Sequence, residues 1–442
     1  MDAYKKIGAI GGGIGLVLCW PLAVGQIGQS AITEGVQHLS NKTLTAELVE
    51  YDRGYFSATA TTKITINDPV MVANLQADDL PTEYTINSDI SHGIVSLSAL
   101  SKLESEVNVP VTLETSTQLN GNTSFDLQID NWNFSAGGNA PMTVSISPSH
   151  FKGHMTVLGE LSYNMKVPSV EVDFFTGEKI TLIELNGEGQ GKQKEGFWLG
   201  DQTITLHNLS INDSIGKTLF EVNKGKYQFV SSSNDKEKRL TTKHKLDADY
   251  FLISGGQIQD YSLDAELSGI DHASFAKVME FYQNNPNPSQ QDVAQVLPYI
   301  ETIFARGFNV TLNDMSLLLS GSEFNTQWDI IVPDSTATSE STSTTATTAS
   351  TASTTTAMAT KGLDPQQVML DTTGTVKVFF SNQLVSAYPF IKQSVDEAIV
   401  MDMITEKPDG YYIDAQIEKG QFVFESGHKI PMIGLFLPML LQ

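Results

Sequence analysis

Long stretches of the chain alternate apolar and polar residues, the pattern of strands with one face packed and the other in water. The alternation begins in TLTAELVEY (43–51) and ATATTKITIN (58–67) and continues as far as QTITLHNLSIN (202–212). Asn-Gly pairs at 120–121 and 186–187 are typical of the turns between such strands. The pattern predicts a long antiparallel meander with one wet face.

Helical periodicity appears only late in the chain. DHASFAKVMEFYQNN (271–285) repeats apolar residues near a period of 3.6 and has Asp271 as an N-cap. A second helix is expected over Val293–Arg306, where Pro298 either kinks it or starts a new one. A third is expected over Asn382–Met403.

The last two helices each precede a hairpin that opens on a glycine and an aromatic residue. These pairs are Gly307-Phe308 and Gly410-Tyr411. We interpret this order as a weak internal repeat.

A low-complexity segment, STATSESTSTTATTASTASTTTAMAT (335–360), separates the two copies. It holds one charge, Glu340, and no large apolar residue except Met358. Such a segment buries too little surface to offset its ordering entropy, so a flexible insert between packed strands is expected. A linker between independent domains is the alternative.

The N-terminal residues predict where the protein is located in the cell. They carry two lysines and then no charge until Glu34, with an apolar run over about Ile7–Ile27 that is long enough to span a bilayer. Lysines before the span and acidic residues after it predict an N-terminus in the cytoplasm and a body outside it, in the periplasm if the cell is Gram-negative. A cleaved signal peptide, with small residues at Ala23 and Gly25, and a lipoprotein at Cys19 stay open.

Together these patterns predict an α+β fold that is predominantly antiparallel β. We expect one or more elongated twisted sheets with a few C-terminal helices, after one N-terminal transmembrane helix. The expected segments are a transmembrane signal-anchor (1–27), a β-rich meander (28–270), helices plus a hairpin (271–334), a Ser/Thr-rich insert (335–362), and a helix plus a hairpin (363–442) that packs on 271–334.

The net charge disfavours one class of partner, and the cysteine count excludes one kind of covalent bond. The 442 residues include 51 acidic and 27 basic side chains, for a net charge of −24, which disfavours binding to nucleic acid. The single cysteine excludes an internal disulfide.

Some stretches approach the residue spacing of catalytic or metal-binding motifs but do not match it. GEGQGKQ (187–193) departs from a phosphate loop at Asn186 and Gln193, and we expect it at a hairpin tip. His150 and His154 are four residues apart, but Gly153 and strand-like flanks argue against a helical metal face. We therefore assign no catalytic, cofactor-binding or metal-binding residue.

Four short motifs, in order along the chain, resemble the bacterial YdgA-like family, also called DUF945. They are YDRGYFS (51–57), ISHG (90–93), LSGID (267–271) and a closing stretch from DGY (409–411) to SGHKIP (426–431). Tyr55, Ile94 and Ser426 depart from the family pattern. The family is essentially uncharacterised, so the resemblance implies an envelope location and no activity.

We interpret the motif residues as structural. In this interpretation Arg53 and Gly54 form a corner at which the rings of Tyr51, Tyr55 and Phe56 are buried. His92 and Gly93 are expected at a turn or strand edge, and Gly427 and Pro431 in the closing strand region.

The expected function is that of an inner-membrane-tethered periplasmic protein without enzymatic activity. It would bind an envelope protein or another copy of itself. Lipid binding or transfer, with phospholipid as the ligand, is the alternative, and hydrolysis of a cell-wall or surface polymer is the third hypothesis.

Overall fold

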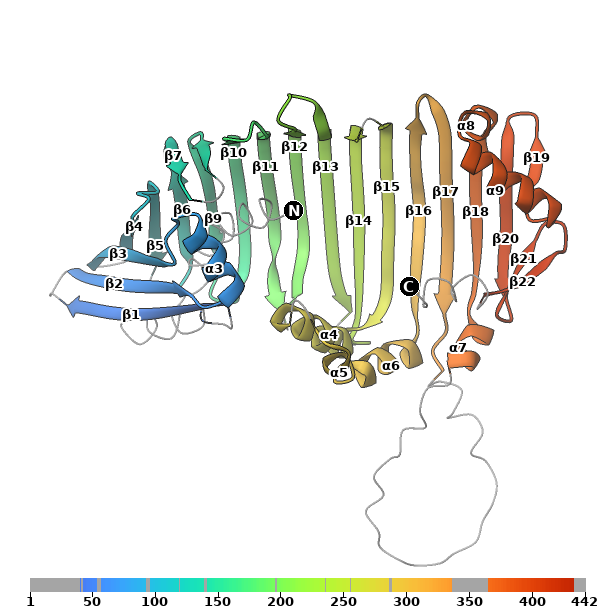
Figure 1. Cartoon of the computed structure of the whole chain (residues 1–442). Coiled ribbons are helices and arrows are strands. Elements are labelled where there is room, and N and C mark those ends of the chain that lie inside the picture. Colours follow the sequence, from blue (N-terminus) through green and yellow to red (C-terminus); the bar gives the residue numbers. More distant parts are fainter. Residues whose placement is uncertain are drawn as a thin grey trace, which may run out of the picture. The chain divides into compact units, whose positions relative to one another are not determined.

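The computed structural model describes residues 40, 43–53, 57–92, 96–118, 120–138, 141–194, 197–234, 236–254, 256–285, 288–335 and 365–432. Strands dominate this part of the chain, and the strand pairs with a defined register are antiparallel (Figure 1). The prediction of a mainly antiparallel β fold with a few helices is confirmed. Among the described residues no helix is long and apolar enough to span a membrane. The expected transmembrane segment, 1–27, lies outside them.

The chain divides into two compact units. Unit 1 comprises 1–193, 200–227 and 248–257, and unit 2 comprises 194–199, 228–247 and 258–442. The division passes through β11 (Lys179–Lys194), β12 (Phe197–Asn212), β13 (Thr218–Asn234), β14 (Arg239–Ile253) and β15 (Gly256–Asp271). We describe each unit by itself, and the segment boundaries expected from the sequence stay a prediction.

Unit 1 begins with short strands and one helix. In chain order these are β1 (Leu44–Arg53), β2 (Ser57–Ile66), α3 (Pro69–Ala77), β3 (Glu83–His92), β4 (Ser96–Glu104), β5 (Val111–Gln118), β6 (Thr123–Ile129), β7 (Trp132–Ala136), β8 (Met142–Ile146), β9 (Ser149–Met155) and β10 (Glu160–Phe174). Strands β1 to β6 pair in sequence, β9 lies between β6 and β10, and β10 also pairs with β8.

Alternation along these strands produces the core of unit 1. In β2 every second side chain is buried, because residues two apart share a face of the sheet. Leu44, Leu75 and Leu127 are each 2% exposed, and Leu75 comes from α3, which packs onto the sheet. The Asp68 carboxylate caps α3 by accepting a hydrogen bond from the Met71 N–H at 2.8 Å.

The glycine-rich stretch 187–193 is not a hairpin tip, so that expectation was wrong. It lies inside β11, where Gly187 and Gly189 pair with Met165 and Tyr163 of β10. A Cβ on Gly189 would lie 2.7 Å from the Tyr163 ring. The glycines therefore make room for large side chains on the neighbouring strand, which a pattern of turn residues does not reveal.

Unit 2 contains the later strands and most of the helices. Its elements after β15 are α4 (His272–Asn284), α5 (Gln290–Val293), α6 (Leu297–Arg306), β16 (Phe308–Leu319), β17 (Ser322–Val332), α7 (Pro365–Asp371), β18 (Thr373–Ser381), α8 (Asn382–Ala387), α9 (Pro389–Val400), β19 (Thr405–Lys407), β20 (Gly410–Glu418), β21 (Gln421–Phe424) and β22 (Lys429–Pro431). Strands β15, β16, β17, β18, β20, β21 and β22 pair in that order.

The helices begin and end where capping and proline chemistry require. Asp271 is the N-cap of α4, as expected. Pro298 lies in the first turn of α6, so it starts a helix rather than kinking one. The helix expected over Asn382–Met403 is two helices, because Tyr388 precedes a proline and adopts an extended conformation.

Candidate functional site

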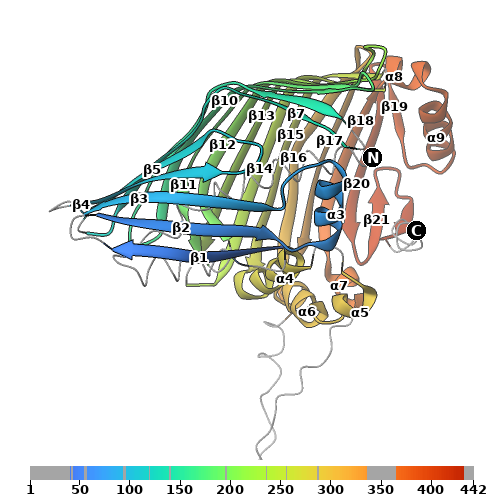
Figure 2. The same cartoon turned by 60° about the vertical axis from the view of Figure 1, so that its left-hand side comes forward.

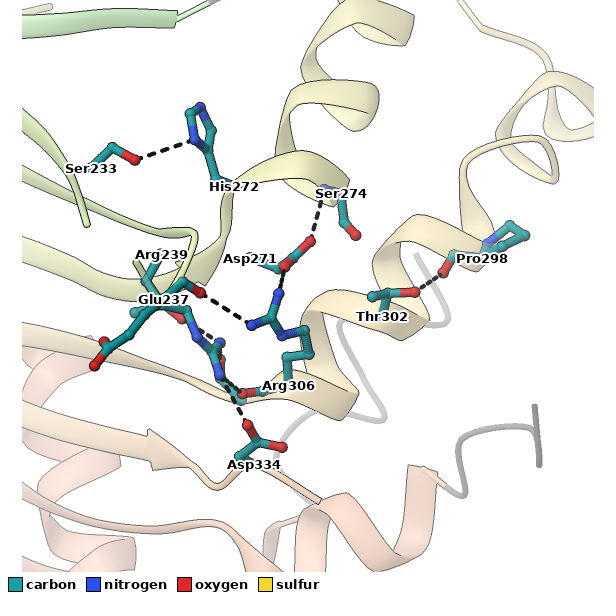
Figure 3. Close-up of polar contacts among 12 residues, drawn as sticks. Ser233, Glu237, Arg239, Asp271, His272, Ser274, Pro298, Thr302, Arg306 and Asp334 are labelled. Carbon is teal, nitrogen blue, oxygen red and sulfur yellow. Dashed lines mark hydrogen bonds and ion pairs between the residues drawn. The ribbon is translucent and has the colours of Figure 1, made fainter. Parts of the chain in front are cut away.

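Arg239, at the start of β14, ties together the ends of several segments of unit 2 (Figure 3). Its Nη1 donates hydrogen bonds to the carbonyl oxygens of Gly269 at 2.7 Å and Gly307 at 2.9 Å. Its Nη2 donates to the carbonyl oxygen of Arg306 at 2.7 Å and to Oδ2 of Asp334 at 3.0 Å. One planar guanidinium thus satisfies acceptors near the end of β15, at the end of α6 and after β17.

A second arginine, Arg306, lies beside the first and closes α6. Its Nη1 forms an ion pair with Oδ2 of Asp271, and its Nη2 donates to the carbonyl oxygen of Glu237 at 3.2 Å (Figure 3). The other Asp271 oxygen accepts from the Ser274 N–H at 2.9 Å and caps α4. Burial raises the pKa of the Asp271 carboxyl, but the Ser274 hydrogen bonds and the Arg306 charge outweigh it, so the pKa lies below its usual value.

Gly307 lets α6 pass directly into β16. Its φ is +68°, a left-handed conformation that favours glycine. A Cβ at this position would lie 2.4 Å from the carbonyl oxygen of Val332, so the backbone here approaches the end of β17 closely. The close approach of these segments depends on a residue without a side chain at this point.

The two arginines border a cavity of about 600 Å³ within unit 2. Polar side chains contribute much of its lining, including Ser233, Asn234 and Glu237. Nearby, Nδ1 of His272 lies 3.3 Å from the Ser233 hydroxyl. This pair is not completed into a catalytic triad, because the neighbouring Asp271 carboxylate already bonds Arg306 and Ser274.

The cavity also gives no support for a metal centre. Within the part of the chain that the structure describes, no three His, Cys, Asp or Glu side chains gather to hold an ion. The His150 and His154 residues singled out in the sequence lie along one face of β9, with Lys152 between them. His154 is placed against the Ser124 hydroxyl at 3.2 Å. Because Arg239 and Arg306 donate to backbone carbonyl oxygens of separate segments, we interpret the arginine cluster as a structural tie.

A second feature of unit 2 is an apolar face on its sheet. Cross-strand register places Leu312, Trp328, Val376 and Ala415 in one row across four strands. We call the set of residues on this face the apolar face: Val310, Leu312, Met315 and Leu317 of β16; Phe324, Trp328 and Ile330 of β17; Val376, Val378 and Phe380 of β18; Ile413, Ala415 and Ile417 of β20.

Most side chains of the apolar face are half-buried rather than enclosed. Helices α4 to α7 gather at one end of the unit 2 strands, and α8 lies at the other end (Figures 1 and 2). Over the middle of β16 to β18, neither view shows a described helix of unit 2. The opposite face is polar, with Gln327 and Asp329 on β17 and Lys377 on β18.

The structure brings two of the sequence motifs together in unit 1. Arg53, at the end of β1, pairs with Ala58 of β2, and Ala58 pairs in turn with Ile90 of β3. The YDRGYFS and ISHG motifs therefore lie at the ends of neighbouring strands. Tyr51 packs against a small cluster that includes Ala58 and Ile90. His92 ends β3 and pairs with Leu97.

Several motif residues carry no structural description, and the rest lie in unit 2. Gly54, Tyr55, Phe56 and Gly93 lie outside the described residues. Gly427 has a φ of +85° in the turn between β21 and β22, where its N–H donates to the carbonyl oxygen of Phe424 at 2.8 Å. Pro431 ends β22 and pairs with Gln421 of β21. The structural interpretation of these motif residues stays a prediction.

Sequence reasoning missed Arg239 and Arg306. A signal was present, because the chain contains only three arginines among its 27 basic residues, and the third is Arg53 of the first motif. At Arg239 and Arg306 the planar guanidinium reaches several acceptors at once, which a lysine ammonium does less well.

Comparison with known proteins gives one match. The family model described as "Bacterial protein of unknown function (DUF945)" matches residues 4–432. No curated protein and no solved structure matches the chain. Because the match covers nearly the whole length and agrees with the ordered motifs, the chain belongs to the DUF945 family.

Proposed function

We propose that this chain is a non-enzymatic protein of the bacterial envelope, tethered to the inner membrane by its N-terminal segment, whose apolar face holds the acyl chains of phospholipid. The observation that carries the proposal is the continuous apolar face of β16, β17, β18 and β20. The tether and the periplasmic location rest on the apolar N-terminal run and its lysines.

The contrast between the enclosed core of unit 1 and the apolar face supports a ligand for this face. In unit 1, alternating strands place Leu44, Ile86 and Leu127 in a core where each is 2–3% exposed. In unit 2, equally apolar positions such as Met315 and Val378 stay half-buried. Contiguous apolar surface left partly in water marks an interaction site, because covering it is favourable.

The geometry of the face suits acyl chains. Each row of the apolar face runs across four strands, and neighbouring strands lie about 4.8 Å apart. A row is therefore longer than a single side chain, as an acyl chain requires. The side chains include aromatic rings, with Phe324 and Phe380 centred 5.3 Å apart, and one methionine, Met315. A flexible hydrocarbon chain conforms to such a surface without needing hydrogen-bond partners.

The second candidate function is binding of an envelope protein or a second copy of the chain, and the same face favours it. A protein partner would cover the apolar rows with its own side chains. The two candidates make different predictions about what lies within reach of the face in the cell.

Site-specific photo-crosslinking distinguishes them. The full chain is produced in a Gram-negative bacterium grown with radioactive phosphate, with a benzophenone amino acid at Val378 or at Lys377. These neighbours point to opposite faces of β18. We expect phosphate-labelled lipid on the Val378 variant and little on the Lys377 variant.

The other outcomes are equally informative. A crosslinked protein at Val378, without lipid, would replace the lipid proposal with the binding module. Equal labelling at both positions would show contact with membrane in general and would count against a lipid-specific face. The substitution Val378→Asp, combined with a crosslinker at Trp328 on the same face, should abolish lipid labelling if the face binds as a unit.

A further inference from the structure

Three hairpin turns of unit 1 lie side by side at the same end of their strands, and we call this row of turns the edge. In an antiparallel meander every second turn falls at the same edge, so the β10–β11, β12–β13 and β14–β15 turns share one (Figure 1). A Cβ on Gly177 in the first turn would lie 2.9 Å from the carbonyl oxygen of Ser214 in the second. The Ser254 N–H at the third turn donates to the carbonyl oxygen of Leu219, at the start of β13, at 2.8 Å.

A large apolar side chain is exposed in each of the first two turns, and another at the end of β14 beside the third. Phe175 is 87% exposed, Ile215 is 85% exposed and Ile253 is 51% exposed. The adjacent Phe174 packs against the core of unit 1, so exposure is specific to the turn position.

Local structure gives no reason for the isoleucine at 215. Oδ1 of Asp213 accepts hydrogen bonds from the Ile215 N–H at 3.0 Å and the Lys217 N–H at 2.8 Å, and Gly216 has a φ of +81°. Aspartate and glycine thus supply the chemistry that the turn needs. Polar residues are usual in such turns, and a side chain that is 85% exposed contributes little to packing.

We propose that this edge, formed by Phe175, Ile215 and Ile253, inserts into the surface of a phospholipid bilayer. Separate apolar side chains on narrow turns fit between lipid head groups, whereas a stable protein interface needs a broad surface of about 800 Å² on each partner.

The charge at the edge suits a bilayer surface better than the rest of the chain does. Residues 173–179, 213–217 and 253–257 carry three acidic and two basic side chains, for a net charge of −1 in a chain with a net charge of −24. Lys179 also pairs with Glu171 of β10, at 2.9 Å. A nearly neutral edge meets no strong repulsion from phosphate groups.

The inference concerns a surface separate from the apolar face and does not depend on it. The edge would set how unit 1 meets the membrane, whether or not unit 2 binds acyl chains. Failure of one proposal therefore leaves the other testable.

Depth-dependent fluorescence tests the edge in the full chain. After Cys19→Ser, one cysteine is introduced by Ile215→Cys, by Phe175→Cys or by Leu158→Cys and labelled with an environment-sensitive nitrobenzoxadiazole dye. Leu158 is the matched control, because it is apolar, 80% exposed and in the turn at the opposite end of β10. The proteins are reconstituted into phosphatidylcholine–phosphatidylethanolamine vesicles with or without phosphatidylcholine spin-labelled on its acyl chain.

We expect the dye at 215 and at 175 to shift to the blue and to lose fluorescence with spin-labelled lipid, and the dye at 158 to do neither. Because all three positions are exposed, the substitutions should leave folding intact, which circular dichroism checks. No quenching at 175 and 215 would overturn the inference and point to a protein partner for the edge. Equal quenching at 158 would overturn it as well, because it would show that the body has no preferred edge at the bilayer.

Discussion

At the scale of single residues, unit 2 depends on an arginine whose donors reach four acceptors. Arg239 is the point where β14, β15, α6 and Asp334, two residues after β17, meet, because its guanidinium bonds three backbone carbonyls and one carboxylate. Backbone acceptors that lose their donors in a partly buried site retain the full cost of their lost hydration.

Replacing Arg239 should therefore destabilise unit 2 far more than removing an ordinary surface charge. We expect Arg239→Met to lower the free energy of unfolding by about 3 kcal/mol, and Arg239→Lys to recover only part of this, because an ammonium lacks the planar fork. The matched control is Lys243→Met on the same strand, whose exposed ion pair with Glu266 should be worth less than about 1 kcal/mol. Urea unfolding of the full chain measures the free energy of unfolding of all three variants. Equal losses for Arg239→Met and Lys243→Met would contradict the role of Arg239 in holding the segments together.

The sequence repeats part of this arrangement elsewhere. Arg306-Gly307-Phe308 places an arginine, a helix-ending glycine and the first residue of a strand in succession. The first motif has the same order of residue types in Arg53-Gly54-Tyr55. In both places the arginine ends one element, α6 or β1, so the type of residue is tied to a junction rather than to the interior of an element.

At the scale of elements, the core of unit 1 combines large rings with glycines on neighbouring strands. The rings of Phe125, Phe151 and Tyr163 follow one another across β6, β9 and β10 with centroids 5.3 and 5.4 Å apart. Gly153 of β9 pairs with both Phe125 and Tyr163, and the Phe125 ring lies where a side chain at 153 would be.

A side chain at Gly153 should break this arrangement. A Cβ there would lie 2.4 Å from the Phe125 ring and 2.4 Å from the carbonyl oxygen of Ser162, which is backbone and cannot move alone. We expect Gly153→Ala to lower the free energy of unfolding by roughly 1–3 kcal/mol.

The matched control for this prediction is Gly187→Ala in β11. Its Cβ would lie 3.1 Å from the flexible end of Met165, and its next neighbours would lie at ordinary contact distances of 3.6 Å and 3.9 Å. Denaturant midpoints of the two variants compare the sites directly. A Gly153→Ala protein as stable as Gly187→Ala would show that the strands shift without cost.

Helices and strands were predictable from the sequence where the spacing of apolar residues kept one period without interruption. The alternation in β2 and the Asp271 cap of α4 gave the right element types. Helix α3 was missed, although its Asp68 cap and Pro69 are visible signals, because its nine residues sit inside a long run of strand patterns. Glycines 187 and 189 were misread as a turn, since a strand glycine is recognisable only from the side chain opposite it.

The candidate site was less predictable than the elements. Arg239 and Asp334 are 95 positions apart, and no local spacing relates them. The apolar face likewise depends on which strands pair, and a bulge between Leu312 and Met315 changes the parity of β16 along its length. Register, rather than composition, decides which apolar residues share the face.

At the scale of the whole molecule, apolar residues on strands are used in two ways. The early strands and α3 of unit 1 enclose a core, whereas the sheet of unit 2 keeps a polar face and a largely half-buried apolar face. Alternation alone does not distinguish these outcomes, because it fixes which residues share a face and leaves open what covers that face.

The Ser/Thr-rich insert provides the last prediction, which concerns how the chain connects its parts. The strands on either side of it, β17 and β18, are paired from Phe324 with Phe380 to Ile331 with Thr373. Because this pairing is made by residues outside the insert, replacing residues 340–360 with a short Gly-Ser linker should change the free energy of unfolding by less than about 1 kcal/mol. Loop-closure entropy varies only slowly with length, at roughly 0.6 kcal/mol for each doubling.

A longer deletion serves as the comparison. Removing residues 340–371 also deletes α7, whose Leu370 side chain lies near Gly420 at the β20–β21 turn. That variant should unfold at a lower temperature than the short deletion when both are followed by circular dichroism. If the short deletion itself lowers the midpoint markedly, the insert contributes contacts that stabilise unit 2, and this outcome would contradict the prediction. If only the long deletion does so, the fold of unit 2 is specified by its strands and helices, and the insert can vary without affecting the apolar face.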